Sequence, residues 1–148
     1  MKNKRSIIES LESFIEGEIL EKDNAYACEH CDEKVTAERR QCIKKLPNVL
    51  VLILRRFEFD YDTMTRQKLN DYLEFPWELD MKNYTQEGLD LKESEQAEEG
   101  ETKPVIDDRV EYPPEYYNFK LKGVVVHMGT ADSGHYYSFI KDRQAETD

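Results

Sequence analysis

The sequence predicts an α+β fold with a mainly antiparallel sheet, because one short helix precedes several strand candidates without regular strand–helix alternation. The chain has 148 residues, a length that fits one ordinary domain. Hydrophobic residues make up 39% of it, and 9 Tyr, 6 Phe and 1 Trp supply enough apolar surface for a core. Wholesale disorder is therefore not expected.

The first expected element is a short amphipathic helix over residues 6–16, which Gly17 is placed to end. The apolar residues at helical spacing are Ile7, Ile8, Leu11 and Phe14. Among the strand candidates that follow, residues 49–57 are rich in β-branched and aliphatic side chains and suit a strand buried on both faces. The other strand candidates are residues 34–45, 67–73, 78–81, 119–127 and 135–141.

Acidic residues are concentrated in one part of the chain. The formal net charge is −11, and residues 86–115 carry 11 acidic and 3 basic residues, which account for −8 of it. We interpret residues 82–117 as a solvated insert that is disordered in part, with a plain spacer as its simplest role. The acidity argues against a nucleic-acid binder, since phosphate contacts need clustered Lys and Arg. No apolar run approaches the roughly 20 residues of a membrane span.

Cys28 and Cys31 form a C-x-x-C pair at an expected turn. Two thiolates at this spacing can supply half of a tetrahedral zinc site, but a second pair is missing from the sequence. The alternatives are two reduced cysteines that bind nothing, or a redox pair, which is disfavoured because no helix start follows to lower a thiol pKa. With Cys42 the number of cysteines is odd, which suggests reduced cysteines, and no signal peptide is visible after Met1. We therefore expect the protein to be located in the cytoplasm or the nucleus.

A second constellation lies between the last two strand candidates. His127 ends one strand, His135 begins the next, and the loop between them contains two glycines. A histidine near pH 7 can act first as a general base and then as a general acid. Glycine lets a substrate backbone come close. On these grounds alone, a structural histidine is the more frequent alternative at a strand start.

Several segments, in order along the chain, resemble the ubiquitin-specific protease family. Residues 46–57 (LPNVLVLILRRF) are similar to its LP-x-x-L…L-K/R-R-F signature, and residues 18–31 resemble its E-x-L-x-x-x-N-x-Y-x-C-x-x-C segment. Phe75-Pro76 resembles its F-P element, and residues 123–129 with 134–138 resemble its histidine box. Residues 70–81 look closest to the large fat-facets-like branch of the family.

The resemblance implies a papain-like cysteine protease that cuts after the C-terminal glycine of ubiquitin, usually at an isopeptide bond to lysine. In such enzymes a Cys attacks the carbonyl, a His moves the proton, and an Asp or Asn orients the His. His135 would be the catalytic histidine. Gly134 and Tyr136 would flank the channel for the ubiquitin tail, with His127 and Gly129 in the loop that borders it. The implied partners are ubiquitin and ubiquitinated proteins, and catalysis would need no cofactor.

By the same resemblance, residues 1–148 form part of a catalytic domain. Its fingers and palm strands would cover residues 6–81, followed by the acidic insert and by the histidine-box strands over residues 118–141. Cys28 and Cys31 match one knuckle of the zinc ribbon at the finger tip. A structural zinc would therefore need the second C-x-x-C pair.

The sequence also departs from the family pattern. The family's nucleophilic cysteine lies upstream of the fingers, and its orienting Asp or Asn lies in a strand after the histidine box; neither has a counterpart here. Asp142 follows His135 by seven residues of one strand, which puts it roughly 23 Å away. We therefore expect the chain alone to be inactive. The alternatives are an inactive ubiquitin-binding module and, disfavoured by the missing knuckle and the acidity, a zinc-ribbon nucleic-acid binder.

Overall fold

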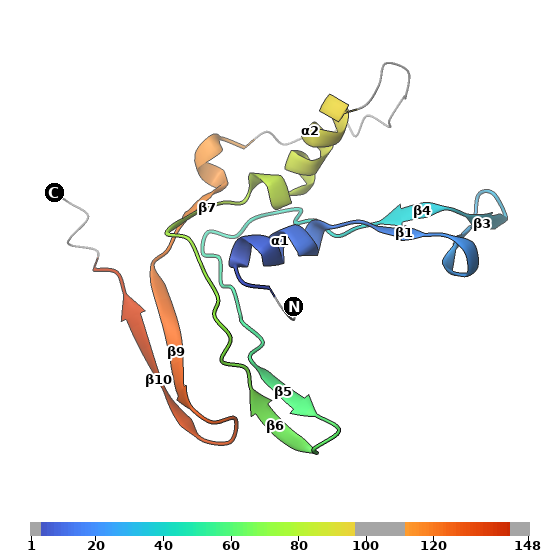
Figure 1. The fold of residues 1–148 in the computed structure, drawn as a ribbon. Helices are drawn as coiled ribbons and strands as arrows, with labels where there is room; N and C mark the ends of the chain where they lie inside the picture. Colours follow the sequence, from blue (N-terminus) through green and yellow to red (C-terminus); the bar gives the residue numbers. More distant parts are fainter. Residues whose placement is uncertain (1–3, 97–111, 143–148) are drawn as a thin grey trace.

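The computed structural model describes residues 4–96 and 112–142. One long arm and two hairpins extend from a small central core in different directions (Figure 1). The strand pairs of the described residues are five antiparallel two-stranded ladders, which confirms the predicted α+β class with antiparallel pairing. In chain order the elements are α1 (Ile7–Ile15), β1 (Glu18–Leu20), η1 (Lys22–Asn24), β2 (Tyr26–Cys28), β3 (Glu33–Val35), β4 (Ala37–Arg39), β5 (Phe57–Asp60), β6 (Thr65–Lys68), β7 (Glu78–Asp80), η2 (Lys82–Tyr84), α2 (Gln86–Gln96), η3 (Pro114–Tyr116), β8 (Asn118–Lys120), β9 (Gly123–Gly129) and β10 (Gly134–Ile140).

Helix α1 is held at its start by side-chain hydrogen bonds. The Ser6 hydroxyl accepts from the Glu9 amide at 3.0 Å, and the Glu9 carboxylate accepts from the Arg5 amide at 2.8 Å. Ile7 and Leu11 face the core and are buried. The helix predicted over residues 6–16 is therefore confirmed to within one residue at each end.

The finger arm, residues 18–39, contains the pairs β1–β4 and β2–β3. It extends away from α1, with the β2–β3 turn at its tip (Figure 1). The continuous strand predicted over residues 34–45 is wrong: β3 ends at Val35, β4 ends at Arg39, and Ile43 makes only an isolated bridge with Thr85. The gap between β3 and β4 lies opposite the turn η1 between β1 and β2, where Lys22 adopts a positive φ of 52°.

The apolar run before β5 is not the buried strand that its composition predicts. Residues 50–56 have no regular secondary structure, and β5 begins only at Phe57. Val49 is 76% exposed and Ile53 is 83% exposed. High β-propensity produces a strand only where a neighbouring strand completes the ladder, and no described strand pairs with this run.

The C-terminal strands agree more closely with the sequence patterns. β7 confirms the strand predicted over residues 78–81, and β10 matches the one predicted over 135–141. The strand predicted over 119–127 is divided into β8, which pairs with β7, and β9, which pairs with β10. Of the strand predicted over 67–73, only the first two residues are in β6.

Helix α2 lies within the acidic stretch, where the sequence interpretation expected solvated chain. Leu89 is buried, the Tyr117 hydroxyl donates to the Glu87 carboxylate, and Arg40 forms an ion pair with Glu93. Burial and the neighbouring Glu87 carboxylate raise the pKa of Tyr117, because both disfavour the phenolate form. The first part of the acidic stretch is thus docked on the core, and residues 97–111 lie outside the described residues.

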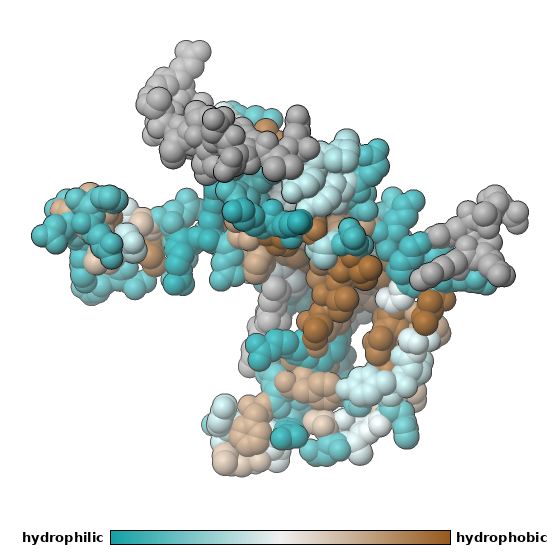
Figure 2. Space-filling view, turned by 180° about the vertical axis from the view of Figure 1, so that it is seen from behind, coloured by the Kyte–Doolittle hydropathy of each residue, from teal (hydrophilic) through white to brown (hydrophobic). Residues whose placement is uncertain are grey.

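The core is a compact cluster beneath α1, β7 and η2. Exposed hydrophobic side chains also gather at the middle of the molecule in the view of Figure 2. The Leu46 amide donates to the Tyr116 hydroxyl at 2.7 Å, which links the cluster to η3. No helix in the described part of the chain is long and apolar enough to cross a membrane. The buried members of the cluster are Ile7, Leu11, Leu46, Leu79, Met81, Tyr84 and Tyr117.

We expect Met81→Ala to destabilise the chain by about 2–5 kcal/mol, because Met81 is 0% exposed and its loss leaves a cavity in the cluster. Urea unfolding followed by circular dichroism measures this change. Met64→Ala is the matched control, since Met64 is 70% exposed and its truncation should change stability by less than about 0.5 kcal/mol. Equal effects for the two variants would contradict this description of the core.

Candidate active-site cleft

The β9–β10 hairpin carries the sequence-predicted site residues. Its register pairs His127 with Tyr136 and Met128 with His135, and the Thr130 amide closes the turn by donating to the Ser133 carbonyl at 2.8 Å. Directly opposed residues of an antiparallel pair share a face, and successive residues alternate. His127 and Tyr136 therefore lie on one face of the hairpin, and His135 lies on the other.

His127 is the centre of a ring cluster that joins this hairpin to β5. Its ring lies edge-on to Phe57 with 5.2 Å between ring centroids, and 4.7 Å from the ring of Tyr136. Its Nδ1 atom is buried and has no hydrogen-bond partner among the described residues. The ring is therefore held by apolar contacts with its two aromatic neighbours.

Gly134 lies directly against the His127 ring. A Cβ atom at this position would be 2.3 Å from both the His127 Nε2 and the Met128 carbonyl oxygen. Gly129, its register partner, has a φ of +123°, which a residue with a side chain rarely adopts. Both glycines of the predicted site are thus required by the local backbone.

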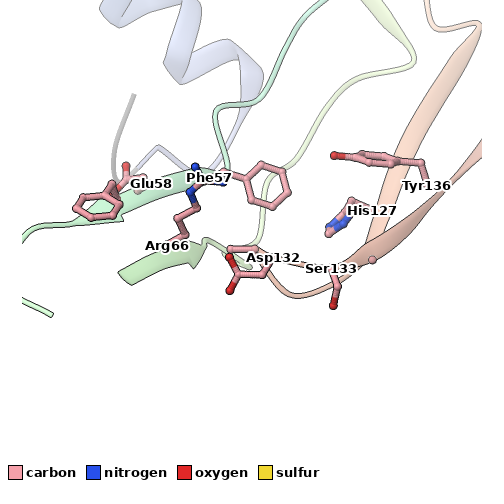
Figure 3. Close-up of a pocket in the computed structure, with 10 residues that line it drawn as sticks. Phe57, Glu58, Arg66, His127, Asp132, Ser133 and Tyr136 are labelled. Carbon is pink, nitrogen blue, oxygen red and sulfur yellow. The ribbon is translucent and has the colours of Figure 1, made fainter. Parts of the chain in front are cut away.

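A shallow cleft of about 500 Å³ lies between the β5–β6 hairpin and the turn of β9–β10. Figure 3 shows Phe57 and Arg66 on the β5–β6 side of the cleft, and His127, Ser133 and Tyr136 on the β9–β10 side. Aromatic faces beside charged groups suit an extended peptide whose backbone and polar side chains need different partners. The residues that line the cleft are Phe57, Glu58, Phe59, Arg66, His127, Ala131, Asp132, Ser133, Gly134 and Tyr136.

The structure brings three of the predicted residues together at this cleft: His127, Gly134 and Tyr136. Gly129 lies at the adjacent turn, and His135 is exposed on the opposite face of the hairpin, one residue from the cleft wall. The sequence analysis missed the β5–β6 wall of the cleft. One signal was available, because Phe57 is the last residue of the signature segment at 46–57.

Cys28 and Cys31 lie at the tip of the finger arm. The Asp32 amide donates to the Cys28 carbonyl at 2.9 Å and closes the turn. The Cys31 amide, the His30 amide and the Cys31 thiol lower the pKa of Cys28 by hydrogen bonding, and a thiolate is the form that binds metal. These two thiols fit half of a zinc site, but no group of three or more candidate ligands occurs among the described residues.

The three cysteines are remote from the histidine hairpin. Cys28 and Cys31 are at the end of the arm, and Cys42 precedes Ile43, whose backbone bridges to Thr85 at the start of α2. The β9–β10 turn lies at the opposite end of the molecule from α2 (Figure 1). None of the described residues that line the cleft is a cysteine.

Comparison with known proteins identifies the family to which this fold and its histidine hairpin belong. The family model of ubiquitin carboxyl-terminal hydrolases matches residues 4–147. The chain is 45% identical over 140 residues to a probable ubiquitin carboxyl-terminal hydrolase FAF of Drosophila melanogaster, and 44% identical over 140 residues to human ubiquitin carboxyl-terminal hydrolase 24. This chain belongs to the ubiquitin carboxyl-terminal hydrolase family.

Solved structures agree with this assignment. The fold is similar to the SAGA Ubp8/Sgf11/Sus1/Sgf73 DUB module bound to ubiquitin aldehyde, with a TM-score of 0.66 and 36% identity. The match covers 97% of this chain and 27% of that one. The matches with the two relatives above cover 95% and 91% of this chain. They cover only 5% of the length of each relative.

Gly134→Ala should destabilise the hairpin by roughly 1–3 kcal/mol, because the added Cβ meets a backbone carbonyl that cannot move freely. It should also displace the His127 ring, which the imidazole proton chemical shifts would report. Gly17→Ala is the control, since its new Cβ meets only the flexible end of Glu38. An unchanged His127 spectrum in Gly134→Ala would contradict the contact.

The lowered pKa of Cys28 has a measurable consequence, because a thiol with a lower pKa forms the reactive thiolate at lower pH. We expect the rate of Cys28 alkylation by iodoacetamide to rise at a lower pH than for an ordinary cysteine, measured by peptide mass spectrometry. Cys31→Ala removes the thiol donor but keeps the backbone donors, so it should move the midpoint part of the way upward. A midpoint at the ordinary cysteine value would show this assignment to be wrong.

Proposed function

We propose that this chain forms the histidine-bearing part of a cysteine-type deubiquitinase that hydrolyses the peptide or isopeptide bond after the C-terminal glycine of ubiquitin. The observation that carries the proposal is the β9–β10 hairpin, which presents His127, Gly134 and Tyr136 to one cleft and His135 beside it. Membership of the hydrolase family supports the reaction class. Two structural neighbours were solved with ubiquitin aldehyde or monoubiquitin, which supports ubiquitin as the partner.

In this proposal His135 takes the proton of a thiol nucleophile and returns a proton to the leaving amine. The nucleophile comes from outside the described cleft, because the cysteines of this chain lie elsewhere. The cleft takes the ubiquitin tail, and Gly134 keeps its wall free of a side chain beside His127. Ubiquitinated proteins are the substrates, and the free cysteines favour cytoplasm or nucleus.

An inactive ubiquitin-binding module is the second candidate function. It would use the same finger arm and cleft to hold ubiquitin without cutting it. This candidate is favoured by the lining of the cleft, because the described residues place a histidine there but no thiol. Binding without cleavage by the full-length protein would support this candidate.

His135→Ala should lower hydrolysis of a ubiquitin C-terminal fluorogenic substrate by about 100- to 10,000-fold in the full-length protein that carries this chain. The isolated 148-residue chain should not cleave the substrate at all. His30→Ala is the matched control, since His30 is an exposed histidine in the finger turn and its loss should leave the rate unchanged. Full activity of His135→Ala would show that His135 takes no part in catalysis.

A further inference from the structure

A lysine outside the proposed catalytic set joins the two sides of the cleft. The Nζ of Lys68, the last residue of β6, donates to the carbonyl oxygens of His127 at 2.9 Å and Gly129 at 3.3 Å. Both acceptors belong to β9 and are two residues apart, so they point to the same edge of that strand. A charged donor makes each of these hydrogen bonds stronger than a neutral one would.

The two carbonyls that Lys68 binds flank Met128, and Met128 is the cross-strand partner of His135. Lys68 therefore contacts the backbone on both sides of the one β9 residue that lies opposite His135. Lys68 is half-buried.

The hairpin needs such a support. Among the residues that the structure describes, β9 and β10 pair only with each other, and two-stranded hairpins are marginally stable in water. The contact of Phe57 with His127 holds the same end of β9 but does not fix the direction of the backbone beyond His127. The two hydrogen bonds from Lys68 extend the attachment to Gly129, where the turn begins.

We propose that Lys68 is a positioning residue, whose ammonium group fixes the end of β9 against β6 and thereby sets where His135 lies. This inference rests on the proposed function, in which His135 is the catalytic histidine. Lys68 touches no reacting atom in that reaction and acts only through the backbone of β9. Its loss should therefore affect the order of the turn and the rate of the chemical step.

Amide hydrogen exchange of the 148-residue chain tests the structural half of the proposal. In Lys68→Met, the Thr130 amide at the turn should exchange about tenfold faster or more, because the edge of β9 loses both hydrogen bonds. Lys68→Arg should stay near the wild-type rate, since a guanidinium group can donate to two carbonyls. Lys34→Met is the matched control: it removes a lysine-to-carbonyl bond to Asp23 in the finger arm and should leave Thr130 unchanged.

Steady-state hydrolysis of a ubiquitin fluorogenic substrate by the full-length protein tests the catalytic half. Lys68→Met should lower kcat by about tenfold or more and change KM by a smaller factor, because a misplaced histidine weakens stabilisation of the transition state, while the loosened end of β9 also borders the cleft proposed for the ubiquitin tail. Lys68→Arg should recover most of the lost kcat. A purely structural role would instead lower the amount of folded enzyme and leave kcat per active site unchanged, as counted with a ubiquitin-based thiol probe.

Unchanged Thr130 exchange in Lys68→Met would overturn the proposal, and so would a loosened turn with an unchanged kcat. If Lys68→Met does not fold, Lys68→Gln keeps a neutral donor, and its Thr130 exchange should lie between the wild-type and the unprotected rate; a wild-type rate would overturn the proposal. If the wild-type protein cleaves no ubiquitin substrate, the proposed function fails, and the exchange experiment still decides whether Lys68 fixes the turn.

Discussion

One hydroxyl group joins two parts of the described chain that are far apart in the sequence. Tyr116 accepts a hydrogen bond from the Leu46 amide at 2.7 Å and donates one to the Leu46 carbonyl at 3.3 Å, across 70 residues of sequence. Leu46 is buried, and a buried peptide group without partners costs about 1–3 kcal/mol per group. This pair lets Leu46 enter the cluster that also holds α1 and β7, and the arm and hairpins extend from there.

The architecture away from this cluster consists of narrow ladders, each of two strands. Such ladders depend on contacts between hairpins, as where Phe57 meets His127 and Lys68 meets β9. The cleft is the space at one of these contacts, so its shape depends on how two separate hairpins meet. Sites that bind extended substrates are commonly drawn from such less stable parts of a protein.

The sequence predicts those elements that depend on local signals. α1 is predicted by the spacing of its apolar residues and by its Ser6 cap. The glycines between β9 and β10 predict the turn, where Gly129 adopts a positive φ. Residues 50–56 do not form the predicted strand, because a strand needs a neighbouring strand to pair with. The amino-acid composition of a segment does not show whether such a neighbour is present. α2 was missed because its weak amphipathic pattern gives little sign that Gly88 and Leu89 are buried. Lys68 was missed because hydrogen bonds from a side chain to a distant backbone leave no pattern in the sequence.

The exposed run before β5 bears on how the chain behaves at high concentration. Residues 49–54 read VLVLIL, without a charge or a proline, and five of the six side chains are exposed. Segments of this kind stack into intermolecular sheets when their edges are free. Of the two arginines that follow, Arg55 is exposed and opposes this association by repelling its copies, while Arg56 is bound to the Leu69 and Asp71 carbonyls. Self-association of this chain should therefore begin at this run and increase with ionic strength, as salt screens Arg55.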